Sequence, residues 1–549
     1  MLTLCILGVG LAIVIGGILG LRLHAFIALV LAGMAVALLT PTRLVERSAI
    51  LEATIAVKSV SADGVISTVS ETTVTDAVLL LDNGRENSMT NPASVLLLPD
   101  GQLHLMLGTN RDFEISALPP ADELILVSRA DYESAQKLAG STFVSRITST
   151  IGEYCGKLAI LIVAASIIGR CLLDSGAAAR IVNSTLSLLG ERMAPAAFVV
   201  SGFTLGIPVF FDTVFYLMIP LGKALRLRTG GNYLLYVLSI VAGGTMAHSL
   251  VPPTPGPLFI CEEFGVPISS MIFGGCIVGL FSASVGMVYA FWINRRCELP
   301  LRDIEEVSAA AEPNAENAPG LFASLVPIVL PVVLITGGSL LSTSADKTNL
   351  FAGITISPDV ARVIKTLGEK NLALLISAAF AVVMYVRTKS PSRDQLSESL
   401  QQAIATAGPI ILVTAAGGAF GRMMRQTSVA ELLNDLPGTS PIMIIVAAFL
   451  VTTAVRTAQG SATVAMITSA GIFGGIVAGG AAGVDPLYVA LAVGCGSKPI
   501  AWMNDSGFWV ITRMSGMTEG EGLKYITPMT ALAGIAGLLA VITGVVMFP

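Results

Sequence analysis

Two ionisable residues of this chain lie in apolar stretches where such residues are rare. Asp212 is the only charged residue between Arg192 and Lys223, and His248 lies in the 31-residue run 230–260, which has no Lys, Arg, Asp or Glu. An ionisable group at membrane depth is costly and is a functional candidate by default. Desolvation favours the neutral form of a carboxyl, and imidazole exchanges protons near neutral pH. Asp212 and His248 are therefore candidates for moving protons, and His248 also for binding an anion.

A third stretch, 456–463, carries the chemistry of a carboxylate site. Arg456 offers a fixed positive charge and a two-pronged donor that matches a carboxylate. Gly460, Ser461 and Thr463 can expose backbone N–H groups at the start of a helix, where the helix dipole attracts an anion. We predict that these four residues bind substrate.

A fourth stretch, 496–507, adds polar side chains to another apolar span. Asn504 and Ser506 can bind hydroxyl groups, and Asp505 can accept a proton or pair with Lys498. Cationic groups, hydroxyls and amides together suit a small hydroxylated anion better than a lipid or a metal ion. We predict proton coupling through Asp212, His248 and Asp505.

Helix-breaking residues accompany each of these side chains. The stretch 242–257 contains four prolines, and a proline removes a helical hydrogen bond and clashes with the preceding turn. Irregular backbone at membrane depth is tolerated only where protein buries it or where it lines a polar cavity. We therefore predict broken helices around a binding site. The predicted substrate-binding set also includes Gly206, Pro208, His248, Ser249 and Thr254.

The composition indicates a membrane protein that crosses the bilayer many times. Of 549 residues, 54% are hydrophobic and 13% are charged, whereas soluble domains carry about 25% charged residues. The net charge of −5 and the lack of a basic tract argue against nucleic acid as a partner. Seven scattered cysteines and three histidines provide no metal-ligand spacing. We expect no metal or other cofactor, no nucleophile–base set and no enzyme activity.

Changes in composition divide the chain into five parts. Residues 42–150 are polar, alternate in places and contain turn signals, which is typical of a small, soluble, β-rich insert. The predicted parts are two transmembrane helices at 1–41, the insert at 42–150, the rest of a first transport repeat at 151–294, a linker at 295–320 and a second repeat at 321–549.

Landmarks in the first repeat recur 252 residues later. Arg170 corresponds to Arg422, and Pro208 corresponds to Gly460. Paired interrupted segments are the best sequence pointer to a transporter site. The predicted fold is an all-α polytopic membrane protein with two repeats, each of five transmembrane helices and one re-entrant hairpin, plus the β-rich insert. Five is odd, so the second repeat is inverted relative to the first.

Short loops on one predicted face hold fifteen Lys and Arg residues, and those on the other hold six. The positive-inside rule places the richer face in the cytoplasm. Both termini and the insert 42–150 are then expected outside. The hairpin near 195–220 would open from the cytoplasm and that near 438–475 from outside.

The motifs at these positions resemble the gluconate permease family of proton symporters. The matching segments are LLDSGAA (172–178), GIPVFFD (206–212), AHSLVPPTPGP (247–257), RTAQGSATVAM (456–466) and NDSGFW (504–509). The resemblance implies uptake of gluconate or a related sugar acid with a proton across the bacterial inner membrane. The chain departs from the family pattern at Asp212, where Glu is common, at 501–505 and at Lys498.

Three hypotheses follow, and the first is a secondary active transporter that couples a small hydroxycarboxylate to protons. The second keeps the fold but couples transport to sodium, held by carbonyl groups beside Gly206 and Gly460. The third is a membrane sensor in which 42–150 is the ligand-binding module. Membrane lipid surrounds the protein in every case, and a homodimer is expected by analogy with the family.

Overall fold

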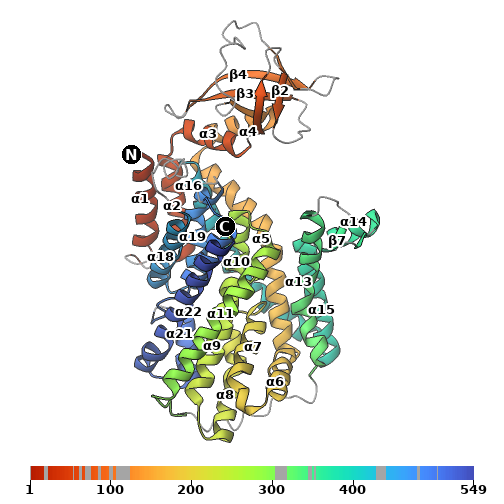
Figure 1. Cartoon of the computed structure of the whole chain (residues 1–549), viewed down its shortest axis with the longest axis vertical. Coiled ribbons are helices and arrows are strands. Elements are labelled where there is room, and N and C mark those ends of the chain that lie inside the picture. Colours follow the sequence, from red (N-terminus) through yellow and green to blue (C-terminus); the bar gives the residue numbers. More distant parts are fainter. Residues whose placement is uncertain are drawn as a thin grey trace.

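The computed structural model describes residues 2–17, 21, 23–53, 55–60, 65–68, 76–83, 88–97, 103–106, 124–302, 318–343, 349–351, 354–355, 357–427, 440–478, 483–503 and 505–548. The described chain is mostly helical. Its helices form a long bundle, and a group of strands lies at one end of that bundle (Figure 1).

The strands form a closed antiparallel barrel that follows the first helices of the chain, α1 (Leu2–Ile15) and α2 (Ala25–Leu39). The strand order around the barrel is β1-β2-β5-β4-β3-β6. The strands are β1 (Ile55–Val60), β2 (Val65–Thr68), β3 (Asp76–Asn83), β4 (Ser88–Leu97), β5 (Leu103–Met106) and β6 (Leu124–Ser128).

Two amphipathic helices join the barrel to the bundle, α3 (Thr42–Glu52) and α4 (Arg129–Gly140). Val78 and Leu80, two residues apart on β3, face the same side of the strand. They pack with Ile50 of α3 and Ala135 of α4 in a small apolar core.

The next helix, α5 (Phe143–Asp174), begins earlier than the sequence suggested. The predicted boundary of the insert was residue 150, but the helix already starts at Phe143. The Thr142 side chain accepts a hydrogen bond from the Ser145 N–H and caps the helix. Phe143 and Ile147 are four positions apart, so they lie on the same face of the helix. That face of the otherwise polar stretch packs against the bundle.

The other helices of the bundle follow in chain order. They are α6 (Ala177–Leu189), α7 (Ala194–Gly206), α8 (Phe211–Thr229), α9 (Tyr233–Leu250), α10 (Pro255–Phe264), α11 (Ile268–Asn294), α13 (Leu321–Thr343), α14 (Pro358–Leu367), α15 (Lys370–Lys389), α16 (Arg393–Arg425), α18 (Pro441–Gln459), α19 (Ala462–Ala478), α20 (Pro486–Gly496), α21 (Ser506–Ser515) and α22 (Glu519–Met547). A two-stranded sheet, β7 (Asn349–Phe351) and β8 (Ile354–Thr355), lies between α13 and α14.

Within the described residues, eight helical segments are long and apolar enough to cross a membrane. One of them, the α9–α10 segment Tyr233–Phe264, lies inside the bundle. Its apolar window is 94% buried, against 33–56% for the other seven. A lipid-facing helix could not tolerate the break between α9 and α10, because lipid offers no partners for freed backbone groups. Burial inside the bundle removes that constraint.

Four helix pairs break where the sequence predicted interruptions. The breaks lie at 207–210, 251–254, 460–461 and 497–505. In the second, Pro252 and Pro253 lack N–H donors, and the Thr254 hydroxyl donates to the Val251 carbonyl at 2.8 Å. In the third, Gly460 ends α18 with a φ of 80°, a conformation that suits glycine.

Close packing holds α7 against the central helix α9. A Cβ atom on Gly243 would lie 2.2 Å from the Val199 carbonyl oxygen, and one on Gly206 would lie 2.9 Å from the Gly244 carbonyl oxygen. Any side chain at Gly243 or Gly206 would therefore separate the two helices.

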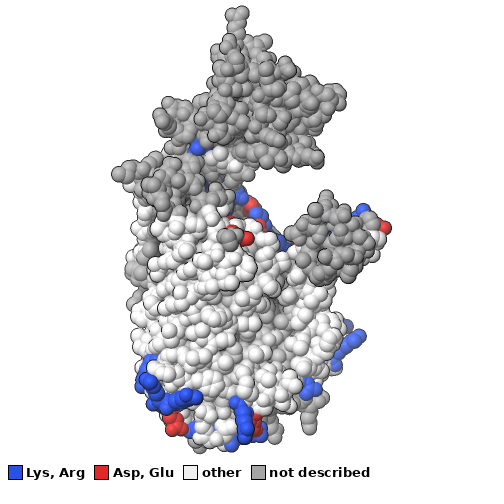
Figure 2. Space-filling view, viewed as in Figure 1, with Lys and Arg blue, Asp and Glu red and all other residues white. Residues whose placement is uncertain are grey.

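Charged residues gather at the two ends of the bundle. Figure 2 shows Lys and Arg side chains at the end away from the barrel, with a broad uncharged belt on the same face. At the barrel end, buried Glu263 of α10 contacts the Arg425 guanidinium at 3.2 Å and accepts a hydrogen bond from the Tyr154 hydroxyl. The neighbouring Glu262 pairs with Lys370 at 2.8 Å. These contacts join α10 to α5, α15 and α16.

Candidate functional site

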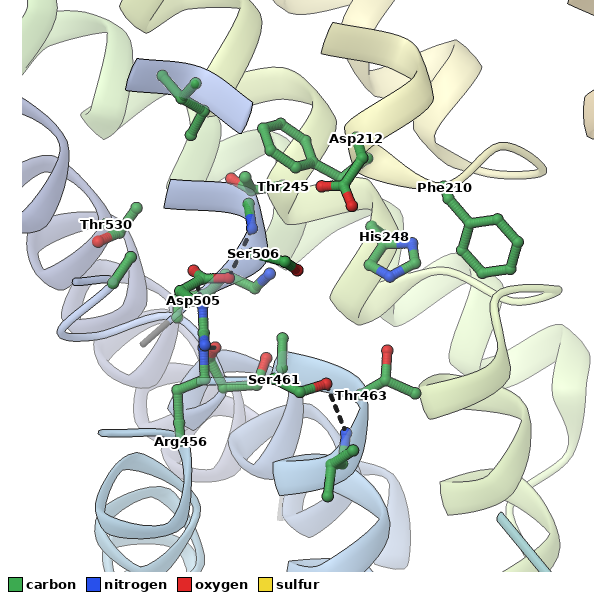
Figure 3. Close-up of a pocket in the computed structure, with 18 of the residues that line it drawn as sticks. Phe210, Asp212, Thr245, His248, Arg456, Ser461, Thr463, Asp505, Ser506 and Thr530 are labelled. Carbon is green, nitrogen blue, oxygen red and sulfur yellow. Dashed lines mark hydrogen bonds and ion pairs between the residues drawn. The ribbon is translucent and has the colours of Figure 1, made fainter. Parts of the chain in front are cut away.

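Three of the four helix breaks, 207–210, 460–461 and 497–505, line one cavity of about 300 Å³, and α9 adds Thr245 and His248 (Figure 3). Both repeats predicted from the sequence contribute to it. Its polar lining consists of Asp212, Thr245, His248, Arg456, Ser461, Thr463, Ser497, Lys498, Asp505, Ser506 and Thr530.

Arg456 binds the other elements of the site together. Its side chain is 5% exposed. The Nε atom donates to the Ser497 carbonyl at 3.1 Å, and the two terminal nitrogens donate to the Gly460 carbonyl and the Asp505 carboxylate. One guanidinium therefore satisfies two backbone carbonyls freed by breaks in two different helices and neutralises a buried acid.

Other freed carbonyls of the 497–505 break also find side-chain donors. The Thr453 hydroxyl donates to the Gly496 carbonyl at 3.1 Å, and the Thr527 hydroxyl donates to the Ala501 carbonyl at 2.5 Å. Unpaired buried carbonyls would destabilise the fold. These hydroxyls keep the irregular segment in place, so its side chains keep fixed positions in the cavity wall.

Lys498 is a buried cation in the same wall. Its side chain is 6% exposed and lines the cavity. Among the described residues, no carboxylate forms an ion pair with its ammonium group. A buried charge without a partner is strongly disfavoured unless another group compensates it. This cation is therefore well suited to an anionic ligand.

Asp505 and Asp212 differ in their partners although they flank the same backbone position. A Cβ atom on Gly507 would lie 3.3 Å from Asp505 Oδ1 and 3.6 Å from Asp212 Oδ1. Asp505 pairs with Arg456 and accepts a hydrogen bond from the Gly507 N–H at 2.9 Å. Asp212 has no ion-pair partner in the described part of the chain.

His248 lies at the edge of the cavity beside Phe210, as Figure 3 shows. The two rings are 5.9 Å apart between centroids and meet edge to face, at 62°. The imidazole is 9% exposed, and its Nδ1 atom has no hydrogen-bond partner among the described residues. An imidazole with an open nitrogen can bind or pass on a proton.

Comparison with known families identifies the scaffold. Residues 124–547 match the model of the family described as GntP family permease. The chain belongs to this GntP permease family. An uncharacterized permease of Haemophilus influenzae is 32% identical over 415 residues, which cover 73% of this chain and 83% of that protein. A gluconate permease of Pseudomonas aeruginosa is 29% identical over 396 residues, covering 71% and 85%.

A solved structure shares the fold of this GntP-family chain. It is that of Neisseria gonorrhoeae MtrF, described as illuminating a class of antimetabolite efflux pumps. The TM-score is 0.55 at 17% sequence identity, and the match covers 81% of this chain and 90% of that one. The family and this shared fold identify a transporter scaffold rather than an enzyme.

Seven of the predicted site residues of this GntP permease line the cavity. They are Asp212, His248, Arg456, Ser461, Thr463, Asp505 and Ser506. The sequence left open a pairing of Asp505 with Lys498, but in the structure Asp505 pairs with Arg456, 49 positions earlier in the chain.

The other predicted residues lie elsewhere. Gly206 packs against α9, Pro208 lines a neighbouring hollow and Ser249 is buried. Thr254 donates to the backbone within its own break, and Gly460 ends a helix and accepts from Arg456. Asn504 lies outside the described residues.

Several lining residues escaped the sequence prediction. Thr245 precedes His248 by three positions, so it lies on the same helix face, and that spacing is a usable signal. Phe210 and Thr530 had no such signal, because apolar and hydroxyl residues are common throughout this chain. In the sequence, Lys498 departs from the family pattern. Only its position in the cavity wall shows that it is not a structural partner of Asp505.

We predict strong coupling between Arg456 and Asp505 of this GntP-family protein. Removing one partner of a buried ion pair costs about 3–5 kcal/mol, because the other charge is left uncompensated. Arg456→Met or Asp505→Asn alone should therefore lower the unfolding temperature in detergent more than Asp359→Asn, which changes an exposed acid. The double variant should be less destabilised than the sum of the two singles. Additive effects would contradict the pairing.

Proposed function

We propose that this protein is a secondary active transporter that takes up gluconate or a related sugar acid together with a proton. The observation that carries the proposal is the buried Lys498, which has no ion-pair partner among the described residues, in a cavity that also holds the Arg456–Asp505 pair. A carboxylate supplies the missing partner of Lys498. The hydroxyls of Ser461, Thr463 and the neighbouring side chains suit a hydroxylated substrate. The gluconate permease of P. aeruginosa supports the same substrate class.

The charges of the cavity favour proton coupling over simple anion binding. Arg456 and Lys498 contribute two positive charges, and Asp505 contributes one negative charge. With Asp212 protonated, one net positive charge remains among the described lining residues, and one carboxylate neutralises it. With Asp212 ionised, the same substrate would leave a net negative charge in a poorly solvated site. Substrate and proton should therefore bind together.

We propose that two inverted repeats build this site, and the helix boundaries support the repeat. Shifted by 252 residues, the starts of α8, α10 and α11 fall at 463, 507 and 520. These positions are each one residue from the starts of α19, α21 and α22, at 462, 506 and 519. In this proposal α7–α8 and α18–α19 are the re-entrant hairpins, and they alternate access to the cavity from opposite faces.

The distribution of basic residues supports an orientation in the bacterial inner membrane. The end away from the barrel is rich in Lys and Arg (Figure 2), so the positive-inside rule places it in the cytoplasm. The barrel within 42–150 then lies on the outer side.

Uptake by the purified protein in liposomes tests the function. With an inward proton gradient and no sodium, labelled gluconate or another sugar acid should accumulate, and a protonophore should abolish the accumulation. Absence of uptake for every sugar acid tested, with either ion, would contradict the proposal.

Sodium coupling is the main alternative and the same assay separates it. The Gly460 carbonyl, one of the predicted sodium ligands, accepts a hydrogen bond from the Arg456 guanidinium. A cation at this oxygen disfavours a second one. Uptake that needs sodium and ignores the pH gradient would nevertheless establish the sodium version.

The sensor alternative is tested by removing the barrel. Ile55 of β1 pairs with Leu126 of β6, so the two ends of the barrel segment lie side by side. A variant that lacks 55–128 can therefore rejoin α3 to α4 without a long gap. Retained uptake would exclude an obligatory sensory role for this segment, whereas lost uptake with an intact bundle would favour one.

A further inference from the structure

Two more hollows lie between the central cavity and the end of the bundle opposite the barrel. The nearer one, of about 470 Å³, is bounded by α5, by the 207–210 break with α8, and by α16. The farther one, of about 420 Å³, lies between α5, α15 and α16 and is lined by Asp174, Lys389 and Glu398.

Neighbouring spaces share lining residues. Phe210 lines both the central cavity and the nearer hollow. Arg170 and Gln402 line both the nearer and the farther hollow. Phe210 therefore borders both the central cavity and the nearer hollow, and Arg170 and Gln402 border both of the outer hollows.

The nearer hollow carries polar side chains, among them Ser166, Arg170 and Gln402, in a wall that is otherwise apolar. The hydroxyl oxygen of Ser166 is buried and has no hydrogen-bond partner among the described residues, although the side chain lines this hollow. Leaving a buried hydroxyl unpaired costs about 1–3 kcal/mol unless water or a solute reaches it. Arg170 and Gln402 add further polar groups along the same wall.

Phe210 is placed to close the connection. It is the last residue of the 207–210 break, with extended backbone rather than helical backbone, and its ring rests edge to face on the His248 ring. In a regular helix the preceding turn excludes some side-chain rotamers, and a residue outside the helix is free of that restriction. Rotation away from His248 would join the central cavity to the nearer hollow.

We propose that these hollows form one aqueous passage from the binding cavity to the face opposite the barrel, and that Phe210 is its gate. The inference rests on the proposed function, since the passage would release the sugar acid that the cavity binds. The polar walls at Ser166, Arg170 and Gln402 replace part of the hydration of a hydroxylated carboxylate on the way.

Thiol labelling tests the passage without any substrate. In a variant whose seven cysteines are replaced, Thr406→Cys places a thiol in the nearer hollow. Ile404→Cys is the matched control, because it lies on the same helix and is exposed like Thr406 but lines none of the three hollows. An impermeant, charged methanethiosulfonate reacts with thiolates, which need water, so it should modify position 406 about ten-fold faster or more than position 404. The reagent should act from the face opposite the barrel.

The gate is tested in the same background with Thr245→Cys, which places a thiol in the central cavity. Phe210→Ala should raise its modification rate about ten-fold from that face, and Phe210→Tyr should not, because only the first removes the ring that covers the thiolate's route to water. Equal rates at 404 and 406, or no effect of Phe210→Ala, would overturn the passage or the gate.

The labelling results can be told apart from the result of the uptake assay, which tests the proposed function. Slow labelling in a protein that takes up gluconate would refute the passage alone. Rapid labelling in a protein that transports no sugar acid would refute the function and leave the passage standing.

Discussion

Replacing Lys498 with Met is expected to weaken gluconate binding and uptake strongly while leaving the protein at least as stable as the wild type. Lys498 is buried in the cavity wall without an ion-pair partner in the described chain. Met has a similar length and no charge, so the change removes an uncompensated buried cation, which favours the folded state. The same change removes the charge that we assign to the substrate carboxylate.

The size of the effect on binding follows from the strength of a charged hydrogen bond. Such a bond contributes about 1.5–3 kcal/mol, and each 1.4 kcal/mol changes an equilibrium constant about ten-fold. Gluconate affinity, measured by calorimetry or by stabilisation against heat, should therefore fall by about 10- to 100-fold. Uptake at low substrate concentration should fall in parallel.

Lys365→Met is the matched control for Lys498→Met. It removes the same charge from an exposed position on α14, so it should change neither affinity nor the unfolding temperature by much. If Lys498→Met lowers the unfolding temperature and leaves the gluconate affinity unchanged, then Lys498 supports the fold and does not bind substrate.

Replacing Asp212 with Asn is expected to separate substrate exchange from proton-driven uptake. The amide resembles the protonated acid in shape but cannot release a proton. The cavity would keep its net positive charge at every pH, so substrate should still bind. Accumulation driven by a pH gradient should fall by about 100-fold or more, because a coupling step that moves no proton stores no energy from the gradient. Exchange of external for internal gluconate should persist.

The pH dependence of gluconate binding is an independent test of the role of Asp212 in the same variant. In the wild type, gluconate affinity should decline as the pH rises, because ionised Asp212 opposes the substrate charge. In Asp212→Asn the affinity should be nearly independent of pH. Asp359→Asn, an exposed acid on α14, should retain the wild-type profile. A retained pH dependence in Asp212→Asn would assign the proton to another group, and His248 and Asp505 are the candidates in the cavity wall.

Much of the site could be anticipated from single residues. Asp212, His248 and Arg456 stand out because a charged or ionisable side chain in an apolar run is rare. The helix breaks were readable because Pro and Gly act locally on the backbone. These signals depend only on neighbouring residues, so no tertiary structure was needed to detect them.

Ion-pair partners and helix packing could not be predicted from neighbouring residues in the same way. Asp505 lies seven positions from Lys498 in sequence, yet it pairs with Arg456, 49 positions away, because the bend after α20 turns it toward α18. Gly206 looked like a substrate-contacting residue but serves the close approach of α7 and α9. The extended start of α5 at Phe143 depends on a capping residue and a spaced apolar face rather than on hydropathy.

The sequence by itself determined the membrane class, the interrupted segments and the chemical types available to the site, because each of these follows from composition and short-range order. Only the tertiary structure decided which charges neutralise one another and which remains without a partner. That difference has a physical cause, since the energy of a buried charge depends on the distances to all its neighbours, and folding alone sets those distances. Lys498 illustrates it, because only the folded chain shows that no carboxylate of the described residues pairs with it in the cavity wall.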